Sequence, residues 1–213
     1  MKHTLRFLAG LLFTVGALRT AAAAELTEIT VEDFHGAAYF ENALEYPEVA
    51  KLPNRRARIR RVARDMGWPP ARLAAAVDKV GSLGSDPVEL AQKAIEEGFK
   101  GTMLEGRILQ VLINADEPKH VIAYIRWRGS HKVDVVKEAS TVAHVVHKQA
   151  PFISTASIAA IHPKAPANTK QTVWSAKIGH SSMARIQPSR IETYADRLYA
   201  RLFENVDDKP IPY

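Results

Sequence analysis

Residues 105–128, EGRILQVLINADEPKHVIAYIRWR, contain two runs in which apolar and polar side chains alternate. A turn sequence, DEPK at residues 116–119, separates the two runs. Alternation with a period of two on either side of a turn predicts a β-hairpin with one buried face. The side chains expected on that face are Leu109, Val111 and Ile113 in the first run and Val121, Ala123, Ile125 and Trp127 in the second.

The remainder of the C-terminal half continues with helical and strand patterns. Residues 131–149 have apolar side chains at helical spacing, residues 152–161 and 171–178 have the character of a second strand pair, and residues 191–203 carry another helical stripe. The segments predict an α+β fold with a ββαββα two-layer core. In this core two helices would cover one face of a four-stranded antiparallel sheet.

The N-terminal half is predicted to be helical. Residues 54–66, 71–80 and 87–97 each have apolar side chains at helical spacing, and Gly67 and Gly98 follow as helix ends. Three consecutive short helices are therefore expected before the first strand.

Capping sequences indicate where two of the helices begin. Asp86 to Glu89 (DPVE) combines an N-cap acid, a proline at the first helical position and a glutamate at the third. Ser189 and Glu192 have the spacing of a second capping box. We therefore expect one helix to follow Asp86 and another to follow Ser189.

The expected elements divide the chain into five segments. They are a signal peptide (1–24), an acidic N-terminal arm with a short strand at 26–34 (25–52), a segment of three short helices (53–98), the α+β core (99–206) and a flexible tail (207–213).

The first 24 residues have the layout of a secretory signal peptide. Lys2 and Arg6 precede the apolar run FLAGLLFTVGAL at residues 7–18, and small residues end at Ala24. The apolar run is shorter than the roughly 20 residues that a spanning helix needs. We expect export to a periplasm and cleavage after Ala24; retention as an anchor is the alternative, because Arg19 is unusual before a cleavage site.

Composition limits the classes of protein and of chemistry. The chain has no cysteine, which excludes disulfides, thiolate metal sites and thiol catalysis. Removal of Lys2, Arg6 and Arg19 with the signal peptide would lower the formal net charge from +6 to +3. The basic character of the complete chain is therefore weak evidence for nucleic-acid binding, and no nucleic acid is expected as a partner.

Charge is strongly segregated near the N-terminus. Residues 25–50 contain seven acids and no lysine or arginine, whereas residues 51–72 contain eight bases and Asp65 alone as an acid. Two interpretations are open. The acidic arm could neutralise the basic helix within one molecule, or the arginines could contact an anionic partner such as lipid headgroups or a polyanion. The arginines concerned are Arg56, Arg60, Arg61 and Arg64.

A second candidate binding surface is the outer face of the predicted sheet. The residues expected on this face are His120, Tyr124, Arg126, Arg128 and Lys177. A face that is polar, basic and partly aromatic could bind an anionic ligand, a carbohydrate or a protein. The alternative is that the face is only hydrated, since antiparallel sheets commonly have one face in water.

Catalytic and metal-binding patterns are weak. His144 and His147 lie three residues apart on a predicted helix, but no third ligand is evident and no metal is expected. Residues 179–182 (GHSS) contain His and Ser without the geometry that a nucleophile requires. The helices around Gly67 have the outline of a helix-turn-helix, which export makes improbable as a chromosome-binding device.

The sequence therefore favours an exported, non-enzymatic binding protein or accessory protein of the cell envelope. Its expected partners are an envelope protein, an anionic lipid or a polyanionic ligand, with no cofactor and no transmembrane span after removal of the signal peptide. The alternative is a cofactor-free hydrolase or transferase that uses a His/Ser or carboxylate site.

Overall fold

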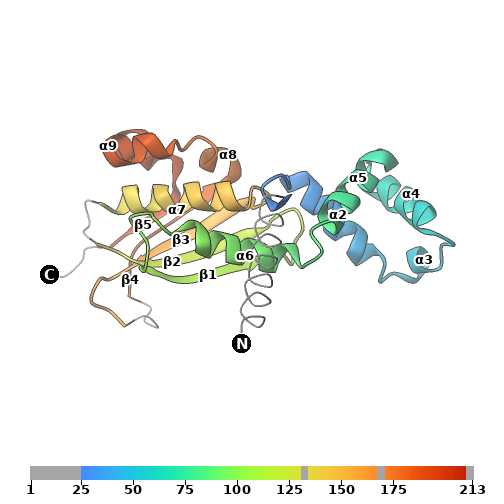
Figure 1. The fold of residues 1–213 in the computed structure, drawn as a ribbon, viewed down its shortest axis with the longest axis horizontal. Coiled ribbons are helices and arrows are strands. Elements are labelled where there is room, and N and C mark those ends of the chain that lie inside the picture. The colour runs from blue at the N-terminus through green and yellow to red at the C-terminus, as the bar shows by residue number, and fades with distance from the viewer. Residues whose placement is uncertain (1–24, 131–133, 167–170, 210–213) are drawn as a thin grey trace, which may run out of the picture.

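A computed structural model describes residues 25–130, 134–166 and 171–209. The helices are α2 (Val31–Ala43), α3 (Pro47–Ala50), α4 (Arg55–Met66), α5 (Pro70–Gly81), α6 (Pro87–Gly98), α7 (Val135–Gln149), α8 (His180–Met183), α9 (Pro188–Leu198) and the 3-10 helix η2 (Ala200–Leu202). The strands are β1 (Ile108–Asn114), β2 (Ile122–Arg128), β3 (Thr155–Ile161), β4 (Thr172–Gly179) and β5 (Glu204–Asp208). The molecule is elongated: helices α2 to α5 project from one end of a body that contains the sheet (Figure 1).

The strands form one mixed sheet with the order β1-β2-β3-β4-β5. The predicted hairpin is confirmed, with β1 and β2 antiparallel and Leu112 opposite Tyr124. The second predicted pair, β3 and β4, is also antiparallel, and Ser157 lies opposite Lys177. Mixed helix and sheet with a helical N-terminal portion is therefore confirmed.

The predicted four-stranded antiparallel sheet is wrong. The sheet has five strands in the described part of the chain, and β2 pairs with β3 in parallel. The physical reason is the connection: a strand, a crossover helix and a neighbouring strand on the same sheet give parallel strands, because the helix returns the chain to the starting edge. Here α7 is that crossover helix.

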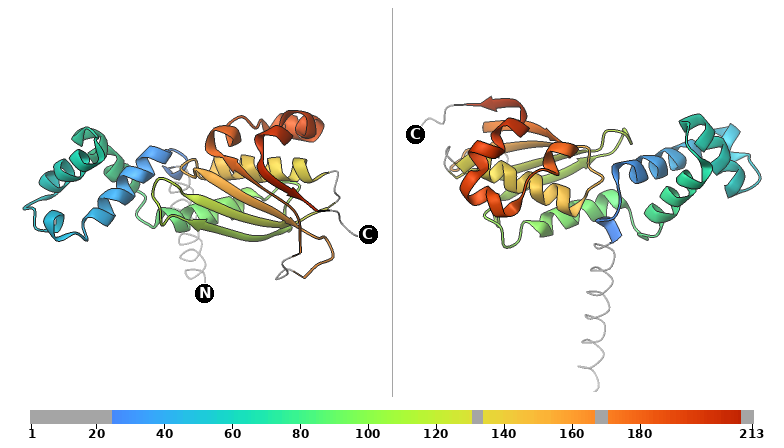
Figure 2. Two further views of the ribbon diagram at one scale, coloured as in Figure 1. Left: turned by 180° about the vertical axis from the view of Figure 1, so that it is seen from behind. Right: turned by 90° about the horizontal axis from the view of Figure 1, so that it is seen from above.

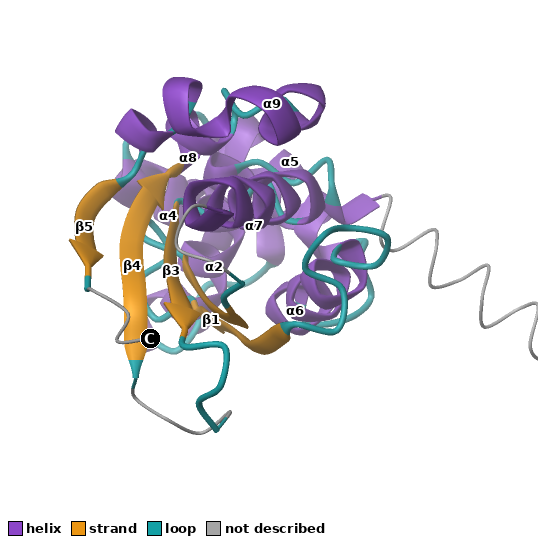
Figure 3. Cartoon of the chain, turned by 90° about the vertical axis from the view of Figure 1, so that its left-hand side faces the viewer, coloured by secondary structure: helices purple, strands orange, loops and turns teal. Residues whose placement is uncertain are grey.

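The helices gather on one face of the sheet. Helix α6 packs on β1, α7 packs on β3, and α9 packs on α7. In the view from behind, the strands lie in front of α6 and α7 (Figure 2, left), and the sheet curves around α7 (Figure 3). The main core lies between these layers and includes Ile125, Trp127 and Ile158.

Two segments differ from the expected elements. The short strand predicted at 26–34 is wrong, because Thr30 caps α2 in a capping box with Asp33 and the helix begins at Val31. Strand β5, which had no sequence prediction, pairs with β4 and includes Asp207 and Asp208 of the predicted tail. Residues 210–213 lie outside the described ranges.

The predicted helix starts have mixed outcomes. Asp86 accepts a hydrogen bond from the backbone N–H of Val88 at 2.8 Å, so this cap is confirmed. The capping box at Ser189 is wrong, since α9 begins at Pro188 after Gln187 and has no side-chain cap. Glu192 instead forms an ion pair with Lys137 of α7. Its side chain therefore joins two packed helices.

Helix α2 connects the body to the projecting helices. Near its start Phe34 stacks on Phe152 of the body, with ring centroids 4.5 Å apart. Further along, Phe40 belongs to a second, smaller core that α2 shares with α3, α4 and α5. We call α2 to α5 the helical unit. Among the described helices, none is both long enough and apolar enough to cross a membrane.

Candidate anion-binding site

The basic sequence of residues 55–66 folds as a well-delimited helix. The side chain of Asn54 accepts a hydrogen bond from the backbone N–H of Ala57 at 2.9 Å and caps the start of α4. Gly67 ends the helix with a left-handed backbone, φ = 69°. Pro69 and Pro70 then start α5, which packs beside α4. Local sequence therefore accounts for both helices and for the short turn between them.

Three arginines form a stripe along the exposed face of α4. Arg56, Arg60 and Arg64 are four residues apart, so their side chains lie on the same face over about 12 Å of helix. All three are exposed, and in the described part of the chain none of them forms a hydrogen bond or an ion pair. We refer to these three side chains as the arginine stripe. Their positive charges are available to a partner.

Three other arginines of α4 already have partners. Arg55 forms an ion pair with Asp78 of α5 at 2.6 Å. Arg61, predicted with the stripe, pairs with Asp65 on its own helix at 3.0 Å. Arg58 donates hydrogen bonds to the carbonyl oxygens of Leu52 and Ala50. These contacts separate bases that hold the local fold from bases that face solvent.

The acidic arm does not cover the arginine stripe. In the described ranges, no ion pair joins a carboxylate of residues 25–50 to an arginine of residues 51–72. Asp33 pairs instead with Lys79 of α5 at 2.8 Å. Burial alone would raise the pKa of Asp33, but hydrogen bonds from Lys79 and Thr30 hold it below its ordinary value. The geometry thus favours the interpretation in which the arginines contact an external anion.

A groove of about 510 Å³ lies between α4 and α5. One wall is cationic and consists of Arg55, Arg56 and Arg60. The remaining lining residues are apolar: Ile59 of α4, which is buried, and Pro70, Ala71 and Ala74 of α5. Helices α4 and α5, whose residues line the groove, lie in the helical unit, away from the sheet (Figure 1).

The turn between α4 and α5 is fixed on α2 by an aromatic contact. Trp68 lies edge-on to His35 with ring centroids 5.8 Å apart, and the guanidinium of Arg72 lies 4.2 Å from a Trp68 ring centroid. A Cβ on Gly36 would come within 2.7 Å of Trp68. Only glycine at position 36 allows Trp68 to pack this closely on α2. The contact fixes the turn that joins α4 and α5, the two helices that line the groove.

The second predicted surface, the outer sheet face, is present. Tyr124 is 41% exposed, Lys177 is also exposed, and both flank Ser157 in one row across β2, β3 and β4. Arg126 lies in the next row, beside Ala159, and is half-buried. His120 is exposed just before β2. The view from behind shows that no described helix covers this face (Figure 2, left).

Arg128, the remaining residue predicted on this face, has a structural contact. Its Nη1 donates to the carbonyl oxygens of Pro163 at 2.7 Å and Ala165 at 2.9 Å. The guanidinium therefore holds the loop that follows β3. The basic side chains of the sheet face lie on different strands and in different rows, so they are more scattered than those of the arginine stripe.

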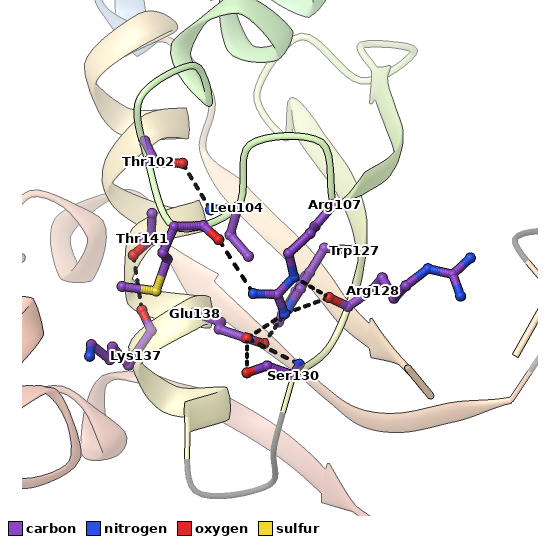
Figure 4. Close-up of polar contacts among 10 residues, drawn as sticks. Thr102, Leu104, Arg107, Trp127, Arg128, Ser130, Lys137, Glu138 and Thr141 are labelled. Atoms are coloured by element: carbon purple, nitrogen blue, oxygen red, sulfur yellow. Dashed lines mark hydrogen bonds and ion pairs between the residues drawn. The ribbon is translucent and has the colours of Figure 1, made fainter. Parts of the chain in front are cut away.

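Sequence reasoning missed a buried charge cluster at the end of β2. Glu138 of α7 is 1% exposed and accepts hydrogen bonds from Arg107 at 2.5 Å, Trp127 Nε1 at 2.8 Å and the Ser130 hydroxyl at 2.5 Å (Figure 4). Arg107 also donates two bonds to the carbonyl oxygen of Arg128. The cluster ties α7 to β2 and to the segment before β1. Its neighbouring cavity of about 10 Å³ admits no more than a water molecule.

One sequence feature could have identified Glu138. It lies three residues after Val135 and four before Val142, within the buried stripe of α7 rather than on its exposed side. A charged residue at such a position needs a buried partner. Arg107, which precedes the first strand, could not have been chosen from its spacing.

The structure brings together two histidines that are far apart in the sequence. The rings of His147 on α7 and His180 on α8 have centroids 5.0 Å apart. His180 Nδ1 lies 3.2 Å from the carbonyl oxygen of Ile153, while His147 Nδ1 is buried and has no hydrogen-bond partner among the described residues. Burial, followed by the charges of His180 and His144, lowers the pKa of His147. This is a packing contact between α7 and α8.

His144 does not join that pair as a ligand set. Burial and the nearby Lys148 charge lower its pKa. Within the described ranges, no group of three or more His, Asp or Glu side chains is placed to hold a metal ion. In the same ranges, no hydrogen bond joins the hydroxyl of Ser181 or Ser182 to a histidine ring.

The arginine stripe and its groove are thus the most coherent candidate site in the described molecule. Comparison with known proteins adds no assignment: no family model matches the sequence, and no curated protein and no solved structure is significantly similar to it.

Proposed function

We propose that this chain is an exported, non-enzymatic binding protein of the cell envelope that attaches to an anionic lipid surface through the arginine stripe. The observation that carries the proposal is that Arg56, Arg60 and Arg64 are exposed, lie on one helix face and form no hydrogen bond or ion pair in the described part of the chain. Each basic residue near an anionic membrane surface contributes about 1 kcal/mol of attraction.

The position of the stripe supports this function. The helical unit projects from the body, so α4 can approach a flat surface without obstruction by the sheet (Figure 1). The guanidinium groups match phosphate oxygens in charge and geometry. Export would place the protein where lipid headgroups, and not chromosomal DNA, are the abundant anions.

Vesicle sedimentation tests the proposal. The protein should bind vesicles that contain phosphatidylglycerol and should not bind phosphatidylcholine vesicles. Replacing Arg56, Arg60 and Arg64 by glutamine should weaken binding roughly a hundredfold, which corresponds to about 3 kcal/mol. The parent protein and the triple variant both contain residues 1–24, so the apolar run in this segment cannot cause a difference in their vesicle binding.

A matched variant separates a local site from net charge. Arg185, Arg190 and Arg201 are exposed in the C-terminal part of the body. Replacing these three by glutamine removes the same total charge and should leave vesicle binding within a few-fold of the parent protein. Equal losses in the two triple variants would show attraction by net charge and would contradict a role for α4.

The export part of the proposal has its own test. Protein recovered from the periplasmic fraction should have Glu25 as its first residue, because the small residues before it favour cleavage after Ala24. Mass spectrometry of the intact protein measures this directly. Recovery of the complete chain from the cytoplasmic fraction alone would contradict export.

A further inference from the structure

The groove beside the arginine stripe has two chemically different walls. On the α4 side, Arg56 and Arg60 line the groove and have no hydrogen-bond or ion-pair partner in the described ranges, whereas Arg55 forms an ion pair with Asp78. On the α5 side, Pro70 and Ala71 offer exposed apolar surface without any charge. A ligand that used both walls would need an anionic group and an apolar part.

The cationic wall is suited to one compact oxyanion. Arg56 and Arg60 are four residues apart on a helix, so their Cβ atoms are about 6 Å apart and two long side chains can converge on one headgroup. Guanidinium groups bind phosphate and carboxylate oxygens in pairs of parallel hydrogen bonds. The two arginines can therefore enclose a single phosphate or carboxylate.

The apolar wall is suited to an alkyl chain. Ile59, Ala71 and Ala74 line the groove, and the two alanine side chains are too short to fill it. A wholly polar anion would leave this surface in contact with water. The volume of about 510 Å³ lies within the range of about 300 to 1,000 Å³ that is usual for small-ligand sites.

We propose that the groove between α4 and α5 binds a single-chain amphiphilic anion. Arg56 and Arg60 hold its phosphate or carboxylate headgroup, and Ile59, Ala71 and Ala74 contact its alkyl chain. This inference rests on the proposed function, because it uses part of the same arginine stripe. It extends that function from attraction to a charged surface to recognition of an individual lipid-like molecule.

A series of alkyl phosphates tests the inference by calorimetric titration. The protein, purified after expression of the complete chain, is titrated with inorganic phosphate and with butyl, hexyl, octyl and decyl phosphate below the concentrations at which they aggregate. Affinity should rise by up to roughly fourfold for each CH2 group that the groove buries. It should stop rising when the groove is full.

Variants assign the two parts of the ligand to the two walls. Replacing Arg56 and Arg60 by glutamine should weaken binding by a similar factor at every chain length. Ala71→Gln should reduce the gain per CH2 group. The matched control is Ala75→Gln, on an exposed position of α5 that does not line the groove, and it should leave the series unchanged.

Three outcomes would overturn the inference. They are an affinity that does not depend on chain length, equal effects of Ala71→Gln and Ala75→Gln, and equal binding of an uncharged octyl glycoside. If alkyl phosphates fail to bind while phosphatidylglycerol vesicles still bind, the inference is wrong and the proposed function stands. If neither binds, both are wrong.

Discussion

At the scale of single residues, one missing methyl group allows α2 and the α4–α5 turn to meet. A Cβ atom on Gly36 would lie only 2.7 Å from the ring of Trp68. No pattern in the sequence identifies this contact, because glycine in a helix normally lowers stability and suggests a helix end. Its position becomes meaningful only when the partner, 32 residues further along the chain, is seen to lie against it.

Gly36→Ala should therefore lower the free energy of unfolding, even though alanine favours helices by about 1 kcal/mol. We expect a net loss of up to about 2 kcal/mol, because overpacking costs about 1 to 3 kcal/mol and alanine's helix preference offsets about 1 kcal/mol of that cost. Gly81→Ala in α5 is the matched control: its Cβ would meet no atom within 4 Å, so stability should rise or stay the same. Urea denaturation of both variants measures the difference, and equal effects would contradict the contact.

The buried pair of Arg107 and Glu138 allows a second prediction at this scale. Arg107→Met leaves the Glu138 carboxylate buried without its cationic partner and should cost about 3 kcal/mol. Adding Glu138→Gln should recover part of the loss, because a neutral amide oxygen can still accept the hydrogen bond from Trp127. A double-mutant cycle by urea denaturation measures the coupling. Strictly additive losses would show that the two side chains do not act as a pair.

At the scale of elements, the sequence predicted whether a segment forms a helix or a strand better than it predicted which strands pair and in which direction. The hairpin of β1 and β2 and the helices α4, α5, α6 and α7 follow from periodicity and caps that lie within each segment. The parallel pairing of β2 with β3 depends on the path of α7, which is a property of the connection. Strand β5 was missed because its residues, ENVDD, are exposed and mostly acidic.

The packing of α7 against α8 and the packing of α2 predict a dependence of stability on pH. Burial is the first cause that lowers the pKa of His144 and His147 on α7 and of His35 on α2, each from an ordinary value of 6.5. As the pH falls through 6.5, the unfolded chain takes up protons that the folded chain does not, so the folded state loses stability. The free energy of unfolding should therefore be highest above about pH 7 and should decrease as the pH falls toward about 5.

Urea denaturation at pH 7.5, 6.5 and 5.5 checks this prediction. Replacing His144 and His147 together by glutamine should flatten the decrease, because these two side chains would no longer protonate in the unfolded chain. A free energy of unfolding that is constant across this range, or that rises as the pH falls, would contradict the burial of the histidines in neutral form.

At the scale of the whole molecule, the sequence could not show whether the acidic segment pairs with the basic segment that follows it. Composition showed an acidic segment followed by a basic one, and both intramolecular pairing and an external partner were open. The fold favours an external partner, because α2 packs on α5 and the carboxylate of Asp33 pairs with Lys79 and not with an arginine of α4. Arg56, Arg60 and Arg64 consequently stay uncovered in the described molecule.

The affinity for phosphatidylglycerol vesicles, measured between 50 and 400 mM salt, tests this arrangement most directly. Exposed charges are screened over about 10 Å at 0.1 M salt and about 3 Å at 1 M. We predict that the parent protein loses affinity steeply across the series, and that the glutamine variant of Arg56, Arg60 and Arg64 binds weakly with a clearly shallower dependence. A parent protein that does not bind at the lowest salt, or a dependence that is the same in parent and variant, would contradict the role of the arginine stripe.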